Sequence, residues 1–129
     1  MAVLDASVIL EILLRRPAGL SVMERVDADE RHAPHLVDIE VMHALRRLVH
    51  LRALSSADAE LGIDTLPKLR IQRHSHQLLL PRIWQLRTSM TAYDAAYVSL
   101  AESLSTPLLT CDGKLSRSHG HHAEIILLQ

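Results

Sequence analysis

Aromatic side chains are almost absent from this chain of 129 residues, which has one tryptophan, two tyrosines and no phenylalanine. Proteins that read RNA on an exposed sheet or an OB-fold stack bases on aromatic rings. The composition therefore argues against recognition by such a stacking platform. The 48% of hydrophobic residues is enough to build one core, and the length fits one domain.

Cysteine occurs once, as Cys111, which excludes an internal disulfide and a cysteine-based zinc site. No activating base is evident around Cys111, so we interpret it as a structural residue. The apolar runs, such as residues 2–4 and 125–128, are far shorter than the roughly 20 residues of a membrane span. The opening residues also lack the basic region of a secretory signal. We expect a cytoplasmic protein that does not enter a membrane.

Lysine is scarce as well, because Lys68 and Lys114 are the only lysines among 14 cationic residues. The formal net charge of −1 argues against a broad basic surface that coats nucleic acid. Contacts with RNA would have to be local. Arg15, Arg46 and Arg47 are candidate phosphate contacts, because a guanidinium binds phosphate in a bidentate manner. The alternative is that these arginines belong to ordinary solvated helix faces.

Short apolar segments alternate with helical patterns along the chain, with no repeat and no linker. The predicted helices cover residues 7–14, 18–27, 37–51, 55–66, 78–87 and 92–104. The predicted strands cover residues 2–4, 32–34, 69–73, 107–110 and 124–128. This alternation predicts a single α/β domain over residues 1–129, with a parallel sheet of about five strands and helices on both faces. Ligands of such sheets bind beyond the carboxyl ends of the strands.

Asp5 and Asp112 each follow the end of a predicted strand, at the sheet edge where ligands are expected. Each also has a structural interpretation. Asp5 could cap the helix that begins near Ser7, and Asp112 with Gly113 is an ordinary turn pair. The positions alone leave both interpretations open.

Asp94 shares a helical face with Tyr97, so its carboxylate projects from the side that faces the core. An acid in that position is costly without a partner. Thr91 and Asp94 also match a capping box, which would satisfy free amides of the first turn. The two roles are compatible.

The helix over residues 37–51 carries two acids, and spacing does not decide between them. Glu40 lies at the edge of the apolar arc, where a surface ion pair is the alternative to a partly buried site. Asp38 lies in the first turn, where the helix dipole favours an acid, and we interpret it as structural. Glu11 has no matching partner and is expected on a solvated face.

Convergence of Asp5, Glu40, Asp94 and Asp112 would bring strong mutual repulsion, which proton uptake or a divalent cation would relieve. Oxygen ligands suit Mg²⁺ or Mn²⁺. Such an ion could activate water for phosphodiester hydrolysis. The hydroxyl of Ser7 or Thr110 could orient water or a ligand, or could simply make local hydrogen bonds at strand–helix turns.

Nine histidines raise the possibility of a further metal site, notably near His119, His121 and His122 and near His74 and His76. The close spacing does not present a preorganised ligand set, and no cysteine is nearby. We interpret these histidines as residues of polar surface loops.

Four segments together resemble the PIN domain of VapC-type toxin ribonucleases. They are residues 3–7 (VLDAS), 40–47 (EVMHALRR), 91–102 (TAYDAAYVSLAE) and 107–115 (PLLTCDGKL). The third segment is the most specific, and the four follow the family order across nearly the whole chain. Residues 55–90 match only in their helical character, and the many histidines and Cys111 depart from the pattern.

The resemblance implies a PIN-like, Rossmann-like fold and an endoribonuclease that uses Mg²⁺ or Mn²⁺. It implies that Asp5, Glu40, Asp94 and Asp112 form the catalytic and metal-binding site, with Ser7 and Thr110 supporting them, and thus selects Glu40 over Asp38. It further implies a homodimer and a cognate antitoxin that blocks the site. The alternatives are a PIN-like domain that binds RNA or a partner without cutting, and a receiver-like phosphoacceptor domain. The receiver pattern of an acidic pair after the first strand is missing here.

Overall fold

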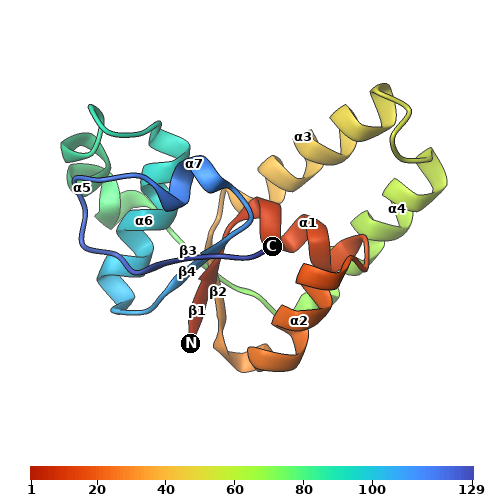
Figure 1. Ribbon diagram of the computed structural model, residues 1–129, viewed down its shortest axis with the longest axis horizontal. Coiled ribbons are helices and arrows are strands. Elements are labelled where there is room, and N and C mark those ends of the chain that lie inside the picture. Colours follow the sequence, from red (N-terminus) through yellow and green to blue (C-terminus); the bar gives the residue numbers. More distant parts are fainter.

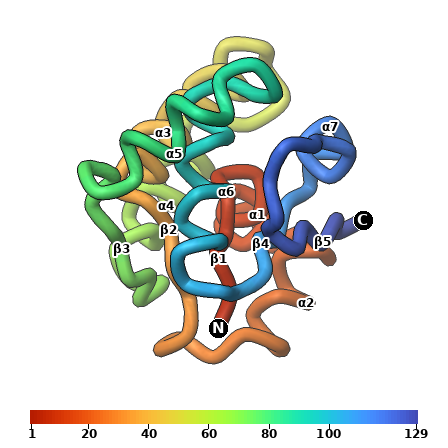
Figure 2. The backbone as a smooth tube through the Cα atoms, turned by 90° about the vertical axis from the view of Figure 1, so that its left-hand side faces the viewer, coloured from red at the N-terminus to blue at the C-terminus, as the bar shows by residue number.

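A parallel five-stranded sheet forms the centre of the computed structural model, which describes residues 1–129. The strands lie in the order β3-β2-β1-β4-β5, and Figure 2 shows them in that order from left to right. Their bounds are Ala2–Leu4 for β1, Arg31–Pro34 for β2, Gln72–His74 for β3, Leu108–Thr110 for β4 and Ile125–Leu127 for β5. β1 is central, because Val3 pairs with His32 on one side and with Leu108 on the other.

Helices cover both faces of the sheet, as the alternating pattern predicted. The α-helices are α1 (Ala6–Leu13), α2 (Pro17–Arg25), α3 (Val37–His50), α4 (Ser56–Thr65), α5 (Leu80–Gln85), α6 (Ala92–Leu104) and α7 (Gly113–Ser116). α6 lies in front of the strands in Figure 2, and α1 lies behind them. α3 and α4 form an arm that projects from the sheet, opposite α5 and α6 (Figure 1). None of the helices has the length and apolar character needed to cross a membrane.

The core is built from aliphatic side chains on the sheet and on the helix faces turned toward it. Val3 and Leu4 of β1 are fully buried, as are Val8 and Ile9 of α1. On the opposite face, α6 buries residues 95–101 without interruption. The three central strands, β1, β2 and β4, are buried on both faces, as is expected of a parallel sheet, whereas the edge strands β3 and β5 are partly exposed. This packing fixes the two helices whose first turns flank the carboxyl end of β1.

The third strand lies later in the chain than predicted. The sequence pattern placed it at residues 69–73, whereas Leu66–Leu69 form a 3₁₀ helix and β3 begins at Gln72. Arg70 ends the 3₁₀ helix in a left-handed conformation with φ of 56°. Leu69 and Ile71 on either side of it are buried in the core. Their apolar character resembled a strand pattern, although it reflects packing of a turn.

Two further short helices, α7 and the 3₁₀ helix Ala28–Glu30, were not predicted. Asp112 and Gly113 read as a turn pair in the sequence. In the structure Asp112 is the N-cap of α7, and its carboxylate accepts a hydrogen bond from the backbone N–H of Lys114 at 2.9 Å. A single helical turn has too few residues to show a helical period.

Candidate functional site

Asp5 lies at the end of β1, where its carboxylate is held by two hydroxyls. Oδ1 accepts a hydrogen bond from Ser7 Oγ and Oδ2 accepts one from Thr110 Oγ1, both at 2.5 Å. Oδ1 also accepts one from the backbone N–H of Val8, so Asp5 caps α1. Each hydroxyl in turn accepts a backbone N–H, from Cys111 and Asp112 respectively. The cap and the sheet-edge position predicted for Asp5 therefore coexist, and Ser7 and Thr110 orient its carboxylate.

Glu40 in the first turn of α3 is paired with a residue of α6. The buried Tyr97 donates its hydroxyl hydrogen to Glu40 Oε1 at 2.5 Å, across 57 residues of sequence. Burial raises the pKa of the Tyr97 hydroxyl, and the hydrogen bond to Glu40 raises it further. Tyr97 therefore stays protonated and serves as a fixed donor. The sequence placed Tyr97 on the face of Asp94, but it did not reveal this contact.

Asp94 in the first turn of α6 is affected by the charges of an acid and a lysine from the segment that follows β4. The Thr91 side chain accepts a hydrogen bond from the Asp94 backbone N–H at 3.2 Å, which completes the predicted N-cap. Burial raises the pKa of the Asp94 carboxyl, and the charge of Asp112 raises it further. Lys114 of α7 partly offsets this increase. Lys114 had no predicted role at the site, although it follows Asp112 by only two residues.

The four acids come from four separate segments and affect one another through their charges. Burial raises the pKa of the Asp5 carboxyl, and the charge of Asp94 adds to this effect. Burial likewise raises the pKa of the Glu40 carboxyl, with contributions from Asp94 and Asp5. The structure thus brings all four predicted acids to the carboxyl edge of the sheet, where like charges repel in a partly desolvated setting.

This donor set fits a hard divalent cation, because it consists of carboxylate and hydroxyl oxygens, and none of the four carboxylates is paired with an arginine. No group of three or more acids, histidines or cysteines stands close enough to enclose an ion by itself. Mg²⁺ does not require such a cage, since it often binds one or two carboxylates together with waters and substrate phosphates.

The other acids and Cys111 have structural surroundings. Asp38 forms a bidentate ion pair with Arg73, with nitrogen–oxygen distances of 2.6 and 2.7 Å. Glu11 Oε1 lies 3.6 Å from Arg16 Nη1 and its side chain is only 22% exposed, so the expected solvated face without a partner is wrong. Burial raises the pKa of the Cys111 thiol, and the charges of Asp5 and Glu11 raise it further, which disfavours the reactive thiolate. The structural interpretation of Asp38 and Cys111 agrees with these contacts.

The C-terminal histidines tie their loop to the body of the protein. His121 Nε2 lies 2.9 Å from Ser118 Oγ, and His122 Nδ1 lies 2.8 Å from Glu102 Oε2. Glu102 also binds Arg82 in a bidentate pair. These contacts fit the interpretation of a surface loop for His121 and His122. The same interpretation is wrong for His74, which is half-buried in β3 with its Nε2 2.8 Å from His32 Nδ1.

The candidate phosphate-binding arginines lie at different distances from the acids. Arg46 and Arg47 belong to α3, six and seven residues after Glu40, which is about 10 Å along the helix axis. Arg15 follows the last turn of α1, about 15 Å along the chain from Asp5. The arginines of α3 are therefore the nearer pair.

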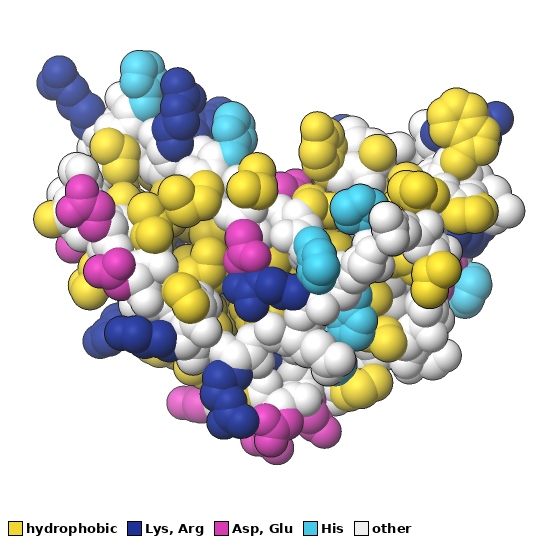
Figure 3. Space-filling model, turned by 180° about the vertical axis from the view of Figure 1, so that it is seen from behind, with side chains coloured by type: hydrophobic (Ala, Val, Ile, Leu, Met, Phe, Trp, Pro, Cys, Tyr) yellow, Lys and Arg dark blue, Asp and Glu magenta, His cyan; other side chains and the backbone are white.

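A cleft opens beside the acids, between the first turns of α3 and α6. This α3–α6 cleft has a volume of about 520 Å³ and is lined by Ala6, Ile39, Glu40, His43 and Tyr93. Figure 3 shows the notch between the two lobes of the molecule, with acidic side chains at its floor and cationic and histidine side chains along the lobe formed by α3 and α4. A substrate thus reaches the carboxylates through an open surface.

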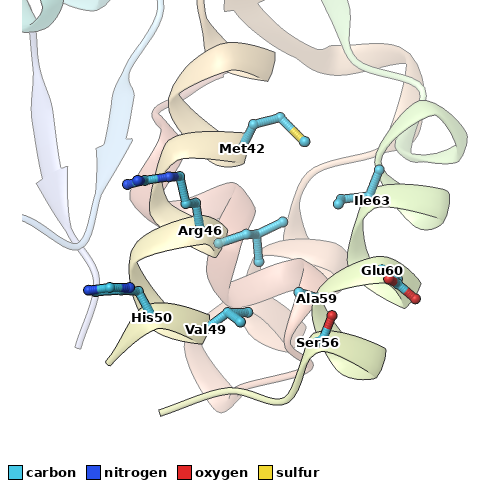
Figure 4. A pocket seen from close by; sticks show the side chains of 9 residues that line it. Met42, Arg46, Val49, His50, Ser56, Ala59, Glu60 and Ile63 are labelled. Carbon is cyan, nitrogen blue, oxygen red and sulfur yellow. The ribbon is translucent and has the colours of Figure 1, made fainter. Parts of the chain in front are cut away.

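A second cleft lies on the other side of α3, against α4. This α3–α4 cleft has a volume of about 410 Å³ and is mainly apolar. In Figure 4, Met42, Val49 and Ile63 point into the space between the helices, whereas Arg46 and His50 extend away from α4. The cleft contains none of the four acids.

Comparison with known sequences identifies relatives over nearly the whole length. The family model of the PIN domain matches residues 2–119. Ribonuclease VapC12 of Mycobacterium tuberculosis is 41% identical over 128 residues, which cover 99% of both chains. Ribonuclease VapC1 of the same organism is 40% identical over 129 residues, covering 98% of this chain and 97% of the relative.

Solved structures show the same fold at lower sequence identity. PAE2754 from Pyrobaculum aerophilum superposes with a TM-score of 0.72 and 21% identity, over 96% of this chain and 81% of that one. FitAB bound to the IR36 DNA fragment has a TM-score of 0.67 and 16% identity, over 98% of this chain and 94% of that one. These likenesses support the architecture and the order of its elements.

Proposed function

The chain belongs to the PIN-domain family and is a VapC-type ribonuclease. On this premise we propose that residues 1–129 form a single PIN domain. We propose that its RNA-cleaving site consists of Asp5, Glu40, Asp94 and Asp112. The observation that carries this assignment is the set of four carboxylates gathered at the carboxyl edge of the sheet. Three of them have raised pKa values from burial and from one another's charge.

We propose Mg²⁺ or Mn²⁺ as the cofactor. Its proposed ligands are the carboxylates of Asp5, Glu40, Asp94 and Asp112, which would bind the ion directly or through water. When bound, the ion supplies Lewis acidity for the attack of water on the phosphodiester. Hydrogen bonds within the chain orient the carboxylates. Ser7 and Thr110 orient that of Asp5, and Tyr97 orients that of Glu40. Lys114 beside Asp94 is suited to pair with a phosphate oxygen.

Cleavage of a structured RNA pool by antitoxin-free protein tests the nuclease assignment. We expect cleavage in Mg²⁺ or Mn²⁺, none in EDTA, and a loss of at least about 100-fold for Asp94→Asn. Circular dichroism of the variant serves as the control for folding. Binding without cleavage by folded, metal-supplemented wild-type protein would favour the PIN-like domain that does not cut.

As the toxin of a toxin–antitoxin pair, the protein has a cognate antitoxin as its partner, and we propose that both are cytoplasmic. The structural neighbour FitAB is bound to a DNA fragment, which is in keeping with an antitoxin that binds DNA. The α3–α4 cleft offers apolar surface for an antitoxin segment. Co-purification with the cognate antitoxin, lost on Met42→Asp, tests this contact.

We also propose a homodimer. Leu78 precedes α5, whereas Leu80 is its first residue and Trp84 lies one turn later; they are 93%, 53% and 67% exposed. Exposed apolar side chains of this kind favour burial against a partner. Sedimentation should show a dimer for the wild type and a monomer for Leu78→Glu. A monomeric wild-type protein would exclude this assembly without affecting the nuclease assignment.

A further inference from the structure

The α3–α6 cleft is continuous with the acidic site. Three of the four acids are either part of its wall or next to it in sequence: Glu40 lines it directly, Ala6 follows Asp5, and Tyr93 precedes Asp94. In RNA, each phosphodiester links two sugars, and each of these sugars carries a base. A phosphodiester bound at the carboxylates therefore places a neighbouring base at the mouth of this cleft.

The walls of the cleft combine apolar and polar groups. Ile39 is 72% exposed and Tyr93 is 64% exposed, so both present apolar surface that nothing in the chain covers. The imidazole of His43, one turn after Ile39, supplies a hydrogen-bonding group whose direction depends on the tautomer. Glu40 supplies a carboxylate acceptor. This combination of an aromatic ring, an aliphatic side chain and a few polar groups is typical of sites that bind an unstacked base.

The lining does not suit a phosphate, because it includes neither lysine nor arginine. Its volume of about 520 Å³ lies within the range of roughly 300–1,000 Å³ found for small-ligand pockets. A base is flat, uncharged and apolar on its faces, which matches this lining better than the sugar–phosphate backbone does. The scarcity of aromatic residues excludes a platform for several bases, but it leaves room for one ring at one position.

We propose that the α3–α6 cleft is a nucleobase subsite, in which one unpaired base next to the cut bond stacks on Tyr93 and contacts Ile39 and His43. This inference rests on the proposed nuclease function and deepens it. Tyr93 thereby becomes a specificity-determining residue that acts through binding of the substrate.

The experiment couples a protein change to an RNA change. Cleavage sites in a randomised single-stranded RNA pool identify a preferred oligonucleotide, which is then synthesised with an abasic nucleotide at each position flanking the cut. At one position, we expect the abasic change to lower wild-type cleavage at subsaturating RNA by at least about fivefold. Tyr93→Ala should show the same loss on the intact RNA and little further loss on the abasic RNA.

Two variants serve as controls. Tyr93→Phe keeps the stacking ring, so it should keep the sequence preference that Tyr93→Ala loses. Leu20→Ala removes a side chain of α2 that is 49% exposed and lies outside the cleft, and it should respond to the abasic RNA as the wild type does.

Three other outcomes would overturn the nucleobase subsite. Cleavage by the wild type with independent, multiplicative effects of Tyr93→Ala and the abasic change would overturn the subsite and leave the nuclease intact. Equal losses for Tyr93→Ala and Tyr93→Phe would also overturn it, because stacking does not need the hydroxyl. Absence of metal-dependent cleavage by the wild type would overturn the proposed function and the subsite together.

Discussion

At the scale of single residues, the acids of the site work against the stability of the metal-free fold. The pKa values of the Asp5, Glu40 and Asp94 carboxyls are raised in the folded protein. In the unfolded chain the pKa values of these carboxyls are about 4. The unfolded chain therefore releases these protons first as the pH rises. The stability associated with these groups is greatest below about pH 4 and is lost as the pH rises through the raised values.

Asp94→Asn should therefore stabilise the protein while abolishing cleavage. At pH 7 in EDTA we expect the free energy of unfolding to increase by about 1 kcal/mol, or a few degrees in Tm. Mg²⁺ should raise the Tm of the wild type more than that of the variant, since a ligand stabilises the state that binds it. Thermal denaturation with and without Mg²⁺ measures both effects. A less stable variant in EDTA would contradict the repulsion argued for this site.

Tyr97 is expected to act as a positioning residue through Glu40. Tyr97→Phe removes one hydroxyl and keeps the buried ring, so Glu40 loses its fixed donor. Loss of such an outer contact typically lowers metal affinity or activity by about 10- to 100-fold. Titration with Mn²⁺, followed by its paramagnetic signal, measures the affinity apart from activity.

Tyr93→Phe is the matched control for that experiment, because the Tyr93 side chain is exposed. A lower Tm for Tyr97→Phe with unchanged Mn²⁺ affinity and unchanged cleavage would assign Tyr97 a purely structural role.

At the scale of elements, the close approach of α1 and α2 depends on Gly19. A Cβ at this buried position would lie 2.4 Å from the backbone carbon and oxygen of Glu11 and from the nitrogen of Ile12. Since the obstructing atoms are backbone, the helices would have to separate. We expect Gly19→Ala to lower the free energy of unfolding by about 2–3 kcal/mol in urea denaturation.

Gly62 in α4 provides the comparison. A Cβ there would make an ordinary contact at 3.7 Å with the Leu13 Cβ, so Gly62→Ala should be neutral or stabilise by up to about 1 kcal/mol, as a helix-interior alanine does. Equal effects of the two substitutions would show that helix propensity, and not the contact between α1 and α2, governs Gly19.

At the scale of the whole molecule, a net charge of −1 leaves RNA attraction to local groups. Arg46→Ala and Arg47→Ala, each in the Asp94→Asn background to prevent cleavage, should weaken binding to different RNAs alike. Each should also reduce the slope of log affinity against log salt by about 0.7 for a single strand. Fluorescence anisotropy over a salt series measures this. Arg15→Ala, farther from the acids, should have a smaller effect. Unchanged RNA affinity in all three variants would show that these arginines do not contact RNA.

The sequence by itself determined the parallel α/β architecture, because the apolar periods that mark buried strands and helix faces are local properties of the chain. It also placed Asp5 and Asp112 after strands and Asp94 on an inward face, and these positions follow from counting residues. Glu40 could not be chosen over Asp38 by spacing. The resemblance to the PIN domain made that choice.

Only the tertiary structure decided which side chains meet. Asp38 pairs with Arg73, 35 residues away, whereas Glu40 accepts from Tyr97, 57 residues away. Packing of distant segments likewise decided three features that the sequence did not predict. These are the position of β3, the helix after Asp112 and the α3–α6 cleft. A buried polar group must find a partner in whatever surrounds it after folding, and those surroundings are set by the packing of the whole chain and not by neighbours in sequence.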